Sequence, residues 1–115
     1  MVTALARKPK KGDLDVDELM RNAQAASDFL KALSHEARLV ILCLLIEGEK
    51  SVSEIEQLLK LRQPAVSQQL ARLRADDLVE TRRDGKNIYY SLARPEIRHV
   101  IEALHSAFCA PDRPR

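Results

Sequence analysis

Two cysteines and three histidines are the side chains of this chain that best suit a zinc ion, and the two thiols can also react with an oxidant. Cys43 lies in the apolar run Leu39–Ile46, where a thiol commonly serves as a small buried hydrophobic side chain. His105 and Cys109 are four residues apart, so they share one face of a helix and could form a three-ligand zinc site with Cys43. His99 and His105 are six residues apart, about 240° around a helix, and cannot hold one ion together.

The composition favours one small domain that is not an enzyme. The chain has 115 residues, 45% of them hydrophobic, which is enough for one modest core. It has no Gly-rich phosphate loop, no nucleophile elbow and no carboxylate pair at a catalytic spacing. Its longest apolar run is far shorter than a membrane span, and the basic residues at 7–11 follow the first apolar residues, unlike in a secretory signal. We therefore expect a cytoplasmic binding protein without a cofactor or a membrane contact.

Hydrophobic spacing predicts two helices in the first half of the chain. Apolar residues recur every three or four positions over about 16–33, as in a helix with one buried face. Ser34 is a candidate N-cap for the second helix, and Gly48 is a candidate end. Because the second helix contains the run LVILCLLI, we expect it to be buried on nearly all sides.

A helix-turn-helix is predicted next. Ser51 and Glu54 form a capping box that opens a short third helix. Pro64 suits the first turn of a fourth helix, which should run to about Arg74. The connection between these two helices, Lys60 to Gln63, has the short length that is typical of a helix-turn-helix.

The fourth helix separates an apolar stripe from a polar one. Val66, Leu70 and Leu73 fall on one side, and Gln68 and Arg72 lie on roughly the opposite side. Glutamine can pair with adenine and arginine with guanine in a major groove. An ordinary amphipathic surface helix would show the same spacing, but the capped helix before it and the basic hairpin after it favour DNA. The predicted DNA-contacting residues of this helix are Gln63, Pro64, Ala65, Ser67, Gln68, Gln69 and Arg72.

A β-hairpin is predicted after the fourth helix. Residues alternate between apolar and polar over 78–82 and 87–92, with Asp84-Gly85 as the turn signal between them. A final helix begins at Pro95 and ends before Pro111. Charges on such a hairpin can simply prevent strand-to-strand aggregation, and they can also bind nucleic acid. The hairpin side chains that we expect to contact phosphates or enter a minor groove are Arg82, Arg83, Lys86 and Asn87.

Charge is distributed unevenly along the chain. Residues 1–12 carry four bases and no acid, residues 13–59 carry four bases and ten acids, and residues 60–98 carry nine bases and five acids. The net charge of +2 therefore conceals a basic segment that coincides with the fourth helix and the hairpin. Such a segment suits a polyanionic partner. The competing class is a protein-interaction module, because the same fold can bind protein instead of DNA.

The predicted order of elements is α-α-α-α-β-β-α, a mainly helical chain with a small β-hairpin wing. Three segments resemble the ArsR family of bacterial winged-helix repressors: ALSHEARLVILCLL, SVSEIEQLL and QPAVSQQLARLRADDLVETRRDGKNIYYSL. The resemblance covers roughly residues 25–109. It implies a homodimer that pairs through its first and last helices, binds double-stranded operator DNA and releases it in response to an inducer. We expect a flexible basic arm at 1–15, a winged helix-turn-helix domain at 16–110 and a flexible tail at 111–115.

The resemblance also allows the metal sites of the family to be tested position by position. In the arsenic and cadmium type, two cysteines flank a valine after a Gly-Glu turn, whereas this chain has Ser51 and Ser53 there. Serine hydroxyls are poor ligands for soft metals. In the zinc type, the last helix supplies two pairs of ligands, and the aligned positions here are Arg94, Glu96, Ala107 and Ala110. We therefore predict neither metal site.

The placement of Cys43 and Cys109 resembles the sulfide- and persulfide-responsive branch of the family, as the strings ILCLLIEGE and ALHSAFCA indicate. In that branch, a cysteine on the second helix and one near the end of the last helix form the sensing pair. The resemblance implies that reactive sulfur species or oxidants join the two thiols through a disulfide or a longer polysulfide, and that DNA is then released. Our preferred order has the more accessible Cys109 react first and Cys43 resolve. The alternative is a zinc-responsive repressor that uses Cys43, His105 and Cys109.

Overall fold

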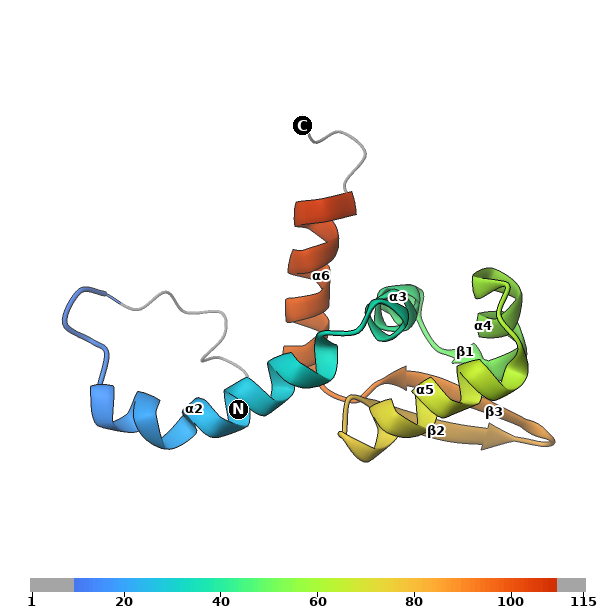
Figure 1. Cartoon of the computed structure of the whole chain (residues 1–115), viewed down its shortest axis with the longest axis horizontal. Coiled ribbons are helices and arrows are strands. Elements are labelled where there is room, and N and C mark those ends of the chain that lie inside the picture. Colours follow the sequence, from blue (N-terminus) through green and yellow to red (C-terminus); the bar gives the residue numbers. More distant parts are fainter. Residues whose placement is uncertain (1–9, 110–115) are drawn as a thin grey trace.

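The computed structural model describes residues 10–109 and confirms the predicted fold class, with one strand added to the predicted order (Figure 1). The predicted tail at 111–115 and most of the predicted arm at 1–15 lie outside the described residues. The elements are α2 (Val16–Leu33), α3 (Glu36–Leu44), the 3-10 turn η1 (Leu45–Glu47), β1 (Lys50–Ser51), α4 (Val52–Leu59), α5 (Gln63–Ala75), β2 (Val79–Asp84), β3 (Asn87–Leu92) and α6 (Pro95–Cys109).

Helix α2 has the predicted bounds and projects away from the rest of the chain (Figure 1). The Asp15 carboxylate caps its first turn by accepting hydrogen bonds from two backbone N–H groups. At its other end, Ala32 and Leu33 are buried against the core. Along most of its length the apolar stripe is exposed, and Met20 has 73% of its surface in solvent. None of the helices in the described part is long and apolar enough to cross a membrane.

The prediction that Ser34 caps the second helix is wrong. The Ser34 hydroxyl and its backbone N–H both donate to the Lys31 carbonyl, so Ser34 ends α2. The N-cap of α3 is His35, whose side chain makes no capping hydrogen bond. A serine between two closely spaced helices can satisfy the end of one or the start of the other, and the backbone path decides which.

The second predicted helix is also shorter and less buried than expected. Regular α-helix ends at Leu44, a 3-10 turn follows, and Gly48 ends that turn at a φ of +133°. Ile41 and Leu42 are fully buried, but Val40 on the same helix is 45% exposed. The apolar run therefore serves two surfaces, one that faces the core and one that does not.

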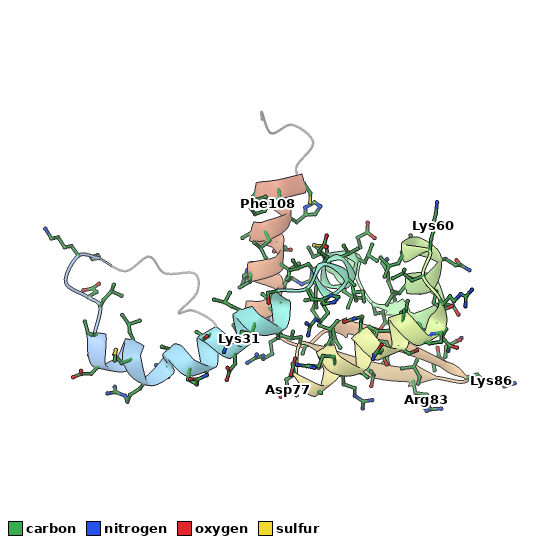
Figure 2. The ribbon with its side chains drawn as sticks, in the orientation of Figure 1. Lys31, Lys60, Asp77, Arg83, Lys86 and Phe108 are labelled. Atoms are coloured by element: carbon green, nitrogen blue, oxygen red, sulfur yellow. The ribbon has the colours of Figure 1, made fainter. Side chains whose placement is uncertain are left out.

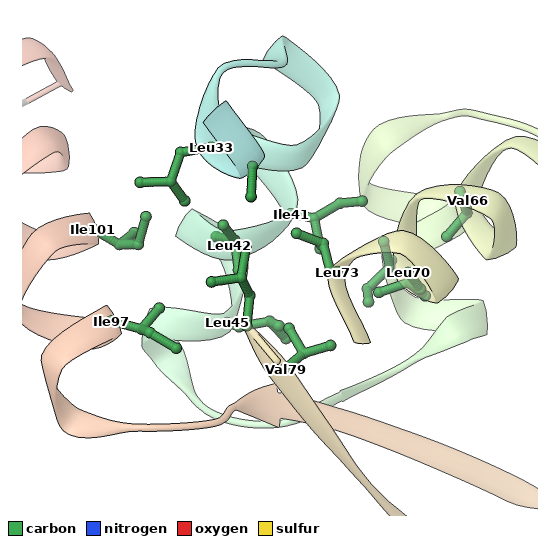
Figure 3. Close-up of a cluster of buried hydrophobic side chains, with 13 residues drawn as sticks. Leu33, Ile41, Leu42, Leu45, Val66, Leu70, Leu73, Val79, Ile97 and Ile101 are labelled. Atoms are coloured by element: carbon green, nitrogen blue, oxygen red, sulfur yellow. The ribbon is translucent and has the colours of Figure 1, made fainter. Parts of the chain in front are cut away.

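The core is built around α3 (Figure 3). Side chains from α3 and η1 contact residues of α5 on one side and of α6 on the other. Each fully buried aliphatic side chain contributes about 1.5–3 kcal/mol relative to its exposed state. The fully buried large side chains are Ile41, Leu42, Leu45, Ile55, Val66, Leu70, Leu73, Leu78, Ile97 and Ile101.

The sheet is antiparallel, in the order β1-β3-β2. Asp84 pairs with Asn87, so the turn consists of Gly85-Lys86, one residue later than the Asp84-Gly85 signal suggested. Gly85 has a φ of +63°, the conformation that favours glycine at the first position of a tight hairpin turn. Strand β1 was not predicted, because its two residues directly before α4 are too few to show an alternating pattern.

Helix α5 ends in a Schellman motif. The Leu78 N–H donates to the Leu73 carbonyl and the Asp77 N–H donates to the Arg74 carbonyl. Leu73 and Leu78 are both buried, which supplies the apolar contact that accompanies this motif. Asp77 adopts a φ of +60°, whereas Asp76 before it has a φ of −89°.

Asp77→Gly should raise the free energy of unfolding by about 0.5 kcal/mol, because glycine adopts the left-handed conformation without a Cβ penalty. The neighbouring Asp76→Gly is the matched control and should lower it by about 0.5–1 kcal/mol, since φ is negative there. Urea denaturation at one fixed chain concentration measures both. An Asp77→Gly variant that is destabilised as much as Asp76→Gly would contradict the assigned backbone conformation.

Candidate nucleic-acid interface and thiol pair

Helix α5 presents a polar face because its apolar stripe is anchored. Val66, Leu70 and Leu73 have no exposed surface, so the opposite side of the helix faces solvent. Pro64 fits into the first turn, and no acidic side chain lies there to repel a phosphate. The predicted contact residues that the structure places on the exposed surface of α5 are Gln63, Pro64, Ala65, Ser67, Gln68 and Arg72.

Two predicted contact residues of α5 differ from the others. Gln69 is only partly exposed, because it lies three residues after the buried Val66 and directly before the buried Leu70. The Arg72 Nε lies 3.4 Å from the Asp76 Oδ2, one turn further along the helix. This pair is mostly in solvent, so it guides the Arg72 side chain without burying it.

The start of α5 and the tip of the wing lie together. A polar cleft of about 230 Å³ is lined by Gln63 from α5 and by Lys86 and Asn87 from the hairpin. Ser51 and Ser53, at the positions of the cysteines in the arsenic-type metal site, line the same cleft. The two predicted halves of the nucleic-acid surface are therefore continuous.

The basic residues of the wing are in two different states. Arg83 and Lys86 are exposed at the tip (Figure 2), and no ion pair within residues 10–109 engages either of them. Arg82 donates hydrogen bonds to both carboxylate oxygens of Glu49, with a distance of 3.1 Å from Nε to Oε2. Its guanidinium also lies 4.8 Å from the centre of the Tyr89 ring.

Sequence reasoning missed Glu49 because it is 33 positions from Arg82. Nothing in the local pattern of either residue predicts the pair. The hydrogen bond from Arg82 is the main cause that lowers the pKa of Glu49 below its usual value. Glu49 thus stays ionised throughout the neutral range.

The two cysteines line one pocket. Cys43 from α3 and Cys109 from α6 both border an apolar cavity of about 600 Å³, and both are free thiols. Cys43 is partly buried and Cys109 is exposed. Burial is the larger cause that raises the pKa of the Cys43 thiol, and the negative charge that Cys109 can carry nearby raises it further. The remaining side chains around the pocket are Leu39, Val40, Leu44, Ile46, Glu47, Leu104, His105 and Phe108.

His105 borders the same pocket, but the three residues of the zinc alternative do not form a ligand set. Across residues 10–109, no three side chains of histidine, cysteine, aspartate or glutamate come together in a way that could hold a metal ion. The geometry of Cys43, His105 and Cys109 therefore gives the zinc-responsive alternative no support.

Arg98 is a second residue that sequence reasoning missed. Its Nη1 donates to the Ile46 carbonyl at 2.7 Å in a partly buried position, and it lies 3.8 Å from Glu102. This hydrogen bond joins α6 to η1, the turn that follows the cysteine-bearing helix α3. A backbone carbonyl 52 positions away leaves no trace in the sequence pattern.

Comparisons with known proteins agree with this geometry. Residues 35–81 match the family described as bacterial regulatory protein, arsR family. The chain is 44% identical over 101 residues to the biofilm growth-associated repressor of Agrobacterium fabrum, covering 88% of this chain and 86% of the relative. It is 41% identical over 100 residues to the transcriptional activator HlyU of Vibrio cholerae, covering 87% and 93% of the two chains.

The solved structure of the transcriptional repressor BigR from Xylella fastidiosa has a TM-score of 0.76 and 41% identity, and the match covers 84% of this chain and 99% of that one. These relatives are named as regulators of transcription and not as enzymes. The resemblance inferred from the sequence is thereby confirmed, and the chain belongs to the ArsR family of DNA-binding transcriptional regulators.

Proposed function

We propose that this chain is a repressor that binds an operator as a homodimer and releases it when reactive sulfur species join Cys43 to Cys109. The observation that carries the proposal is that two thiols, 66 positions apart in the chain, border one pocket between α3 and α6. Both helices also supply core contacts, so a covalent link between them would act on the packing of the whole domain.

DNA binding is assigned to the exposed face of α5 and to the tip of the wing. Gln68 and Arg72 have the side chains that read adenine and guanine in a major groove. Arg83 and Lys86 can contact phosphates or enter the adjacent minor groove. Because the cleft at Gln63 connects the two surfaces, the α5 helix and the wing of one protomer can contact the same DNA duplex. Such a role places the protein in the cytoplasm.

The proposed homodimer accounts for apolar surface that a single chain leaves in water. Leu19 and Leu30 on α2 are at least half exposed, and Phe108 on α6 is 79% exposed. These are the two helices through which the resemblance implies pairing. A second copy of the chain would cover them and would set two α5 helices on half-sites about one helical turn, roughly 34–36 Å, apart.

The proposed switch is a balanced thiol exchange. The Cys109 thiolate attacks the outer sulfur of a hydropersulfide RSSH, which forms a persulfide on Cys109 and releases the thiol RSH. The Cys43 thiolate then attacks Sγ of Cys109, which forms the disulfide and releases hydrogen sulfide. The sulfane sulfur of RSSH is the oxidant, and it accepts the two electrons that the two thiols lose. If both cysteines are first converted to persulfides, the same displacement leaves a trisulfide.

A bridge would act on DNA binding through α6. It would fix the end of α6 against α3, and α6 belongs to the proposed dimer interface, so the spacing of the two α5 helices would change. A preference of about 3 kcal/mol for the released arrangement would weaken DNA binding about a hundredfold, within the usual range of allosteric coupling.

For DNA recognition, Gln68→Ala and Arg72→Ala should each cost about 1–3 kcal/mol of operator binding and relax base preference. Arg83→Ala should weaken binding to all sequences and reduce the dependence of log K on log salt by about one. Fluorescence anisotropy on operator and mixed-sequence duplexes measures both effects. Lys31→Ala, on α2 and far from the wing (Figure 2), is the control and should change neither. Unaltered affinity and preference in Gln68→Ala would mean that another face reads the DNA.

For the homodimer, Leu19→Glu should shift the chain toward monomer, because it places a charge in the exposed apolar stripe of α2. Ala25→Glu adds the same charge about 120° away around the helix, outside the centre of that stripe. This variant should leave the dimer, and so the molecular mass of the assembly in solution, unchanged. Sedimentation equilibrium over a range of chain concentrations distinguishes the two. A dimer that is equally stable in both variants would place the interface elsewhere.

For the switch, Cys43→Ser and Cys109→Ser should each bind DNA when reduced, since neither thiol lies on α5 or the wing. Neither variant should release DNA after treatment with a persulfide donor, because one thiol cannot bridge the helices. Intact mass spectrometry of the treated parent should show a disulfide, or a species heavier by whole sulfur atoms. Release of either single variant as readily as the parent would overturn the cross-link. Tight stoichiometric zinc binding that needs Cys43, His105 and Cys109 and releases DNA would instead support the zinc alternative.

A further inference from the structure

The Arg82 side chain crosses the middle of the sheet. Strand β3 lies between β1 and β2, and Arg82 on β2 pairs directly with Tyr89 on β3. The guanidinium lies over the Tyr89 ring and reaches Glu49, the residue immediately before β1. One side chain thus connects the outer strand of the wing to the segment at the opposite edge of the sheet.

Arg82 and Glu49 form a bidentate ion pair. Two guanidinium nitrogens of Arg82 meet the two oxygens of Glu49, the arrangement in which arginine and a carboxylate match best. Asp84 adds a second acid 3.8 Å from Arg82. The hydrogen bond lowers the pKa of Glu49, so the contact is complete above the usual range for glutamate and is lost only as pH falls through the lowered value.

We propose that Glu49 and Arg82 are positioning residues that set the angle of the wing, and that Arg82 does not bind DNA phosphate. The inference rests on the proposed binding of DNA by the wing, and it revises the expectation that Arg82 is itself a contact. Arg83 follows Arg82 in the strand, so its side chain leaves the opposite face of the ribbon, and it lies exposed near the tip (Figure 2). Phosphate contact is thereby left to Arg83 and Lys86.

A two-stranded ribbon needs such a support. Ribbons of two strands twist strongly and are marginally stable alone, and β1 pairs with β3 through only two residues. The contact of Arg82 with Glu49 links β2 to the residue before β1, and these two strands are not neighbours in the sheet. It therefore fixes the wing relative to the segment that leads into β1 and α4.

The segment that contains Glu49 is itself hydrogen-bonded to α6. Glu49 comes two residues after the end of η1, and the η1 carbonyl of Ile46 accepts the hydrogen bond from Arg98. Residues 46–49 are therefore hydrogen-bonded to α6 through Ile46 and to the wing through Glu49. A displacement of α6 would in this way reach the segment that orients the wing.

The opposite role for Arg82, a phosphate ligand restrained by Glu49, predicts an effect of the opposite sign. Removal of Glu49 would then free a cation and tighten DNA binding. If the pair positions the wing, removal of Glu49 weakens binding even though an acid is lost. Glu47→Ala is the matched control, since Glu47 is a neighbouring acid that pairs with Lys50 and not with the wing.

The test measures binding of a mixed-sequence DNA duplex by the full-length chain over a series of salt concentrations. Glu49→Ala and Arg82→Ala should each weaken binding about two- to fivefold without a change in salt slope, and Arg83→Ala should lower the slope by about one. The exchanged double variant Glu49→Arg/Arg82→Glu should recover part of the loss. Tighter or unchanged binding by Glu49→Ala, or a slope lowered by about one in Arg82→Ala, would overturn the proposal.

Amide hydrogen exchange without DNA separates this inference from the proposed function. The β2 and β3 amides should exchange faster in Glu49→Ala than in Glu47→Ala, while the α5 amides stay unchanged in both. Equal exchange in the two variants would overturn the proposal that Glu49 and Arg82 position the wing. A parent chain that binds no duplex would overturn the proposed function, and the exchange rates would still decide whether Glu49 and Arg82 hold the wing.

Discussion

Helix α3 lies between α5 and α6 in the core, and its buried side chains hold both helices in place. This nine-residue helix and the 3-10 turn after it supply Ile41, Leu42 and Leu45, all without exposed surface, to a core shared with α5 and α6. Protein interiors are close-packed and transmit displacements, because little empty space is left to absorb them. A movement of α6 must therefore be met by a movement of α3 or by a loss of contact, and α5 packs on the same helix. In this small domain the helix that we propose to contact DNA and the helix that ends in Cys109 both pack against α3.

The same helix explains why the thiols have unequal surroundings. One side of α3 is used up by the core, so Cys43 occupies the side that faces the apolar pocket and is only partly covered. Cys109 lies at the far end of α6, in solvent. The accessible thiol is thus suited to meet a dissolved reagent, and the sheltered thiol is suited to displace what the first one has bound. Burial raises the pKa of Cys43, and in the proposed switch this favours the order in which Cys43 reacts second, once the sulfur of Cys109 has become a good electrophile.

Local signals in the sequence predicted most of the fold. The bounds of α2, the capping box at Ser51 and Glu54, and the buried stripe of α5 depend on residues within one or two turns of each other. The errors occur where a local signal is ambiguous: Ser34 could cap either of two helices, and Gly85 could occupy either position of a two-residue turn. Strand β1 and the contacts of Arg82 and Arg98 could not be predicted, because they join residues that are distant in the chain. The shared pocket of Cys43 and Cys109 belongs to the same class, and only the zinc alternative and the resemblance to a family brought the two thiols together.

Because the apolar stripe on α2 is exposed in a single chain, the amount of the proposed dimer would depend steeply on how much of the protein a cell makes. A monomer leaves Leu19, Met20 and Leu30 in water, so in the proposed dimer the gain from covering them depends on encounter between two chains. Where most chains are single, the number of paired chains varies with the square of the number made. Halving gene dosage would then remove about three-quarters of the DNA-binding units. A promoter under such control would also sense how much regulator the cell has synthesised, and a regulator that represses its own gene would be held near the level at which pairing begins.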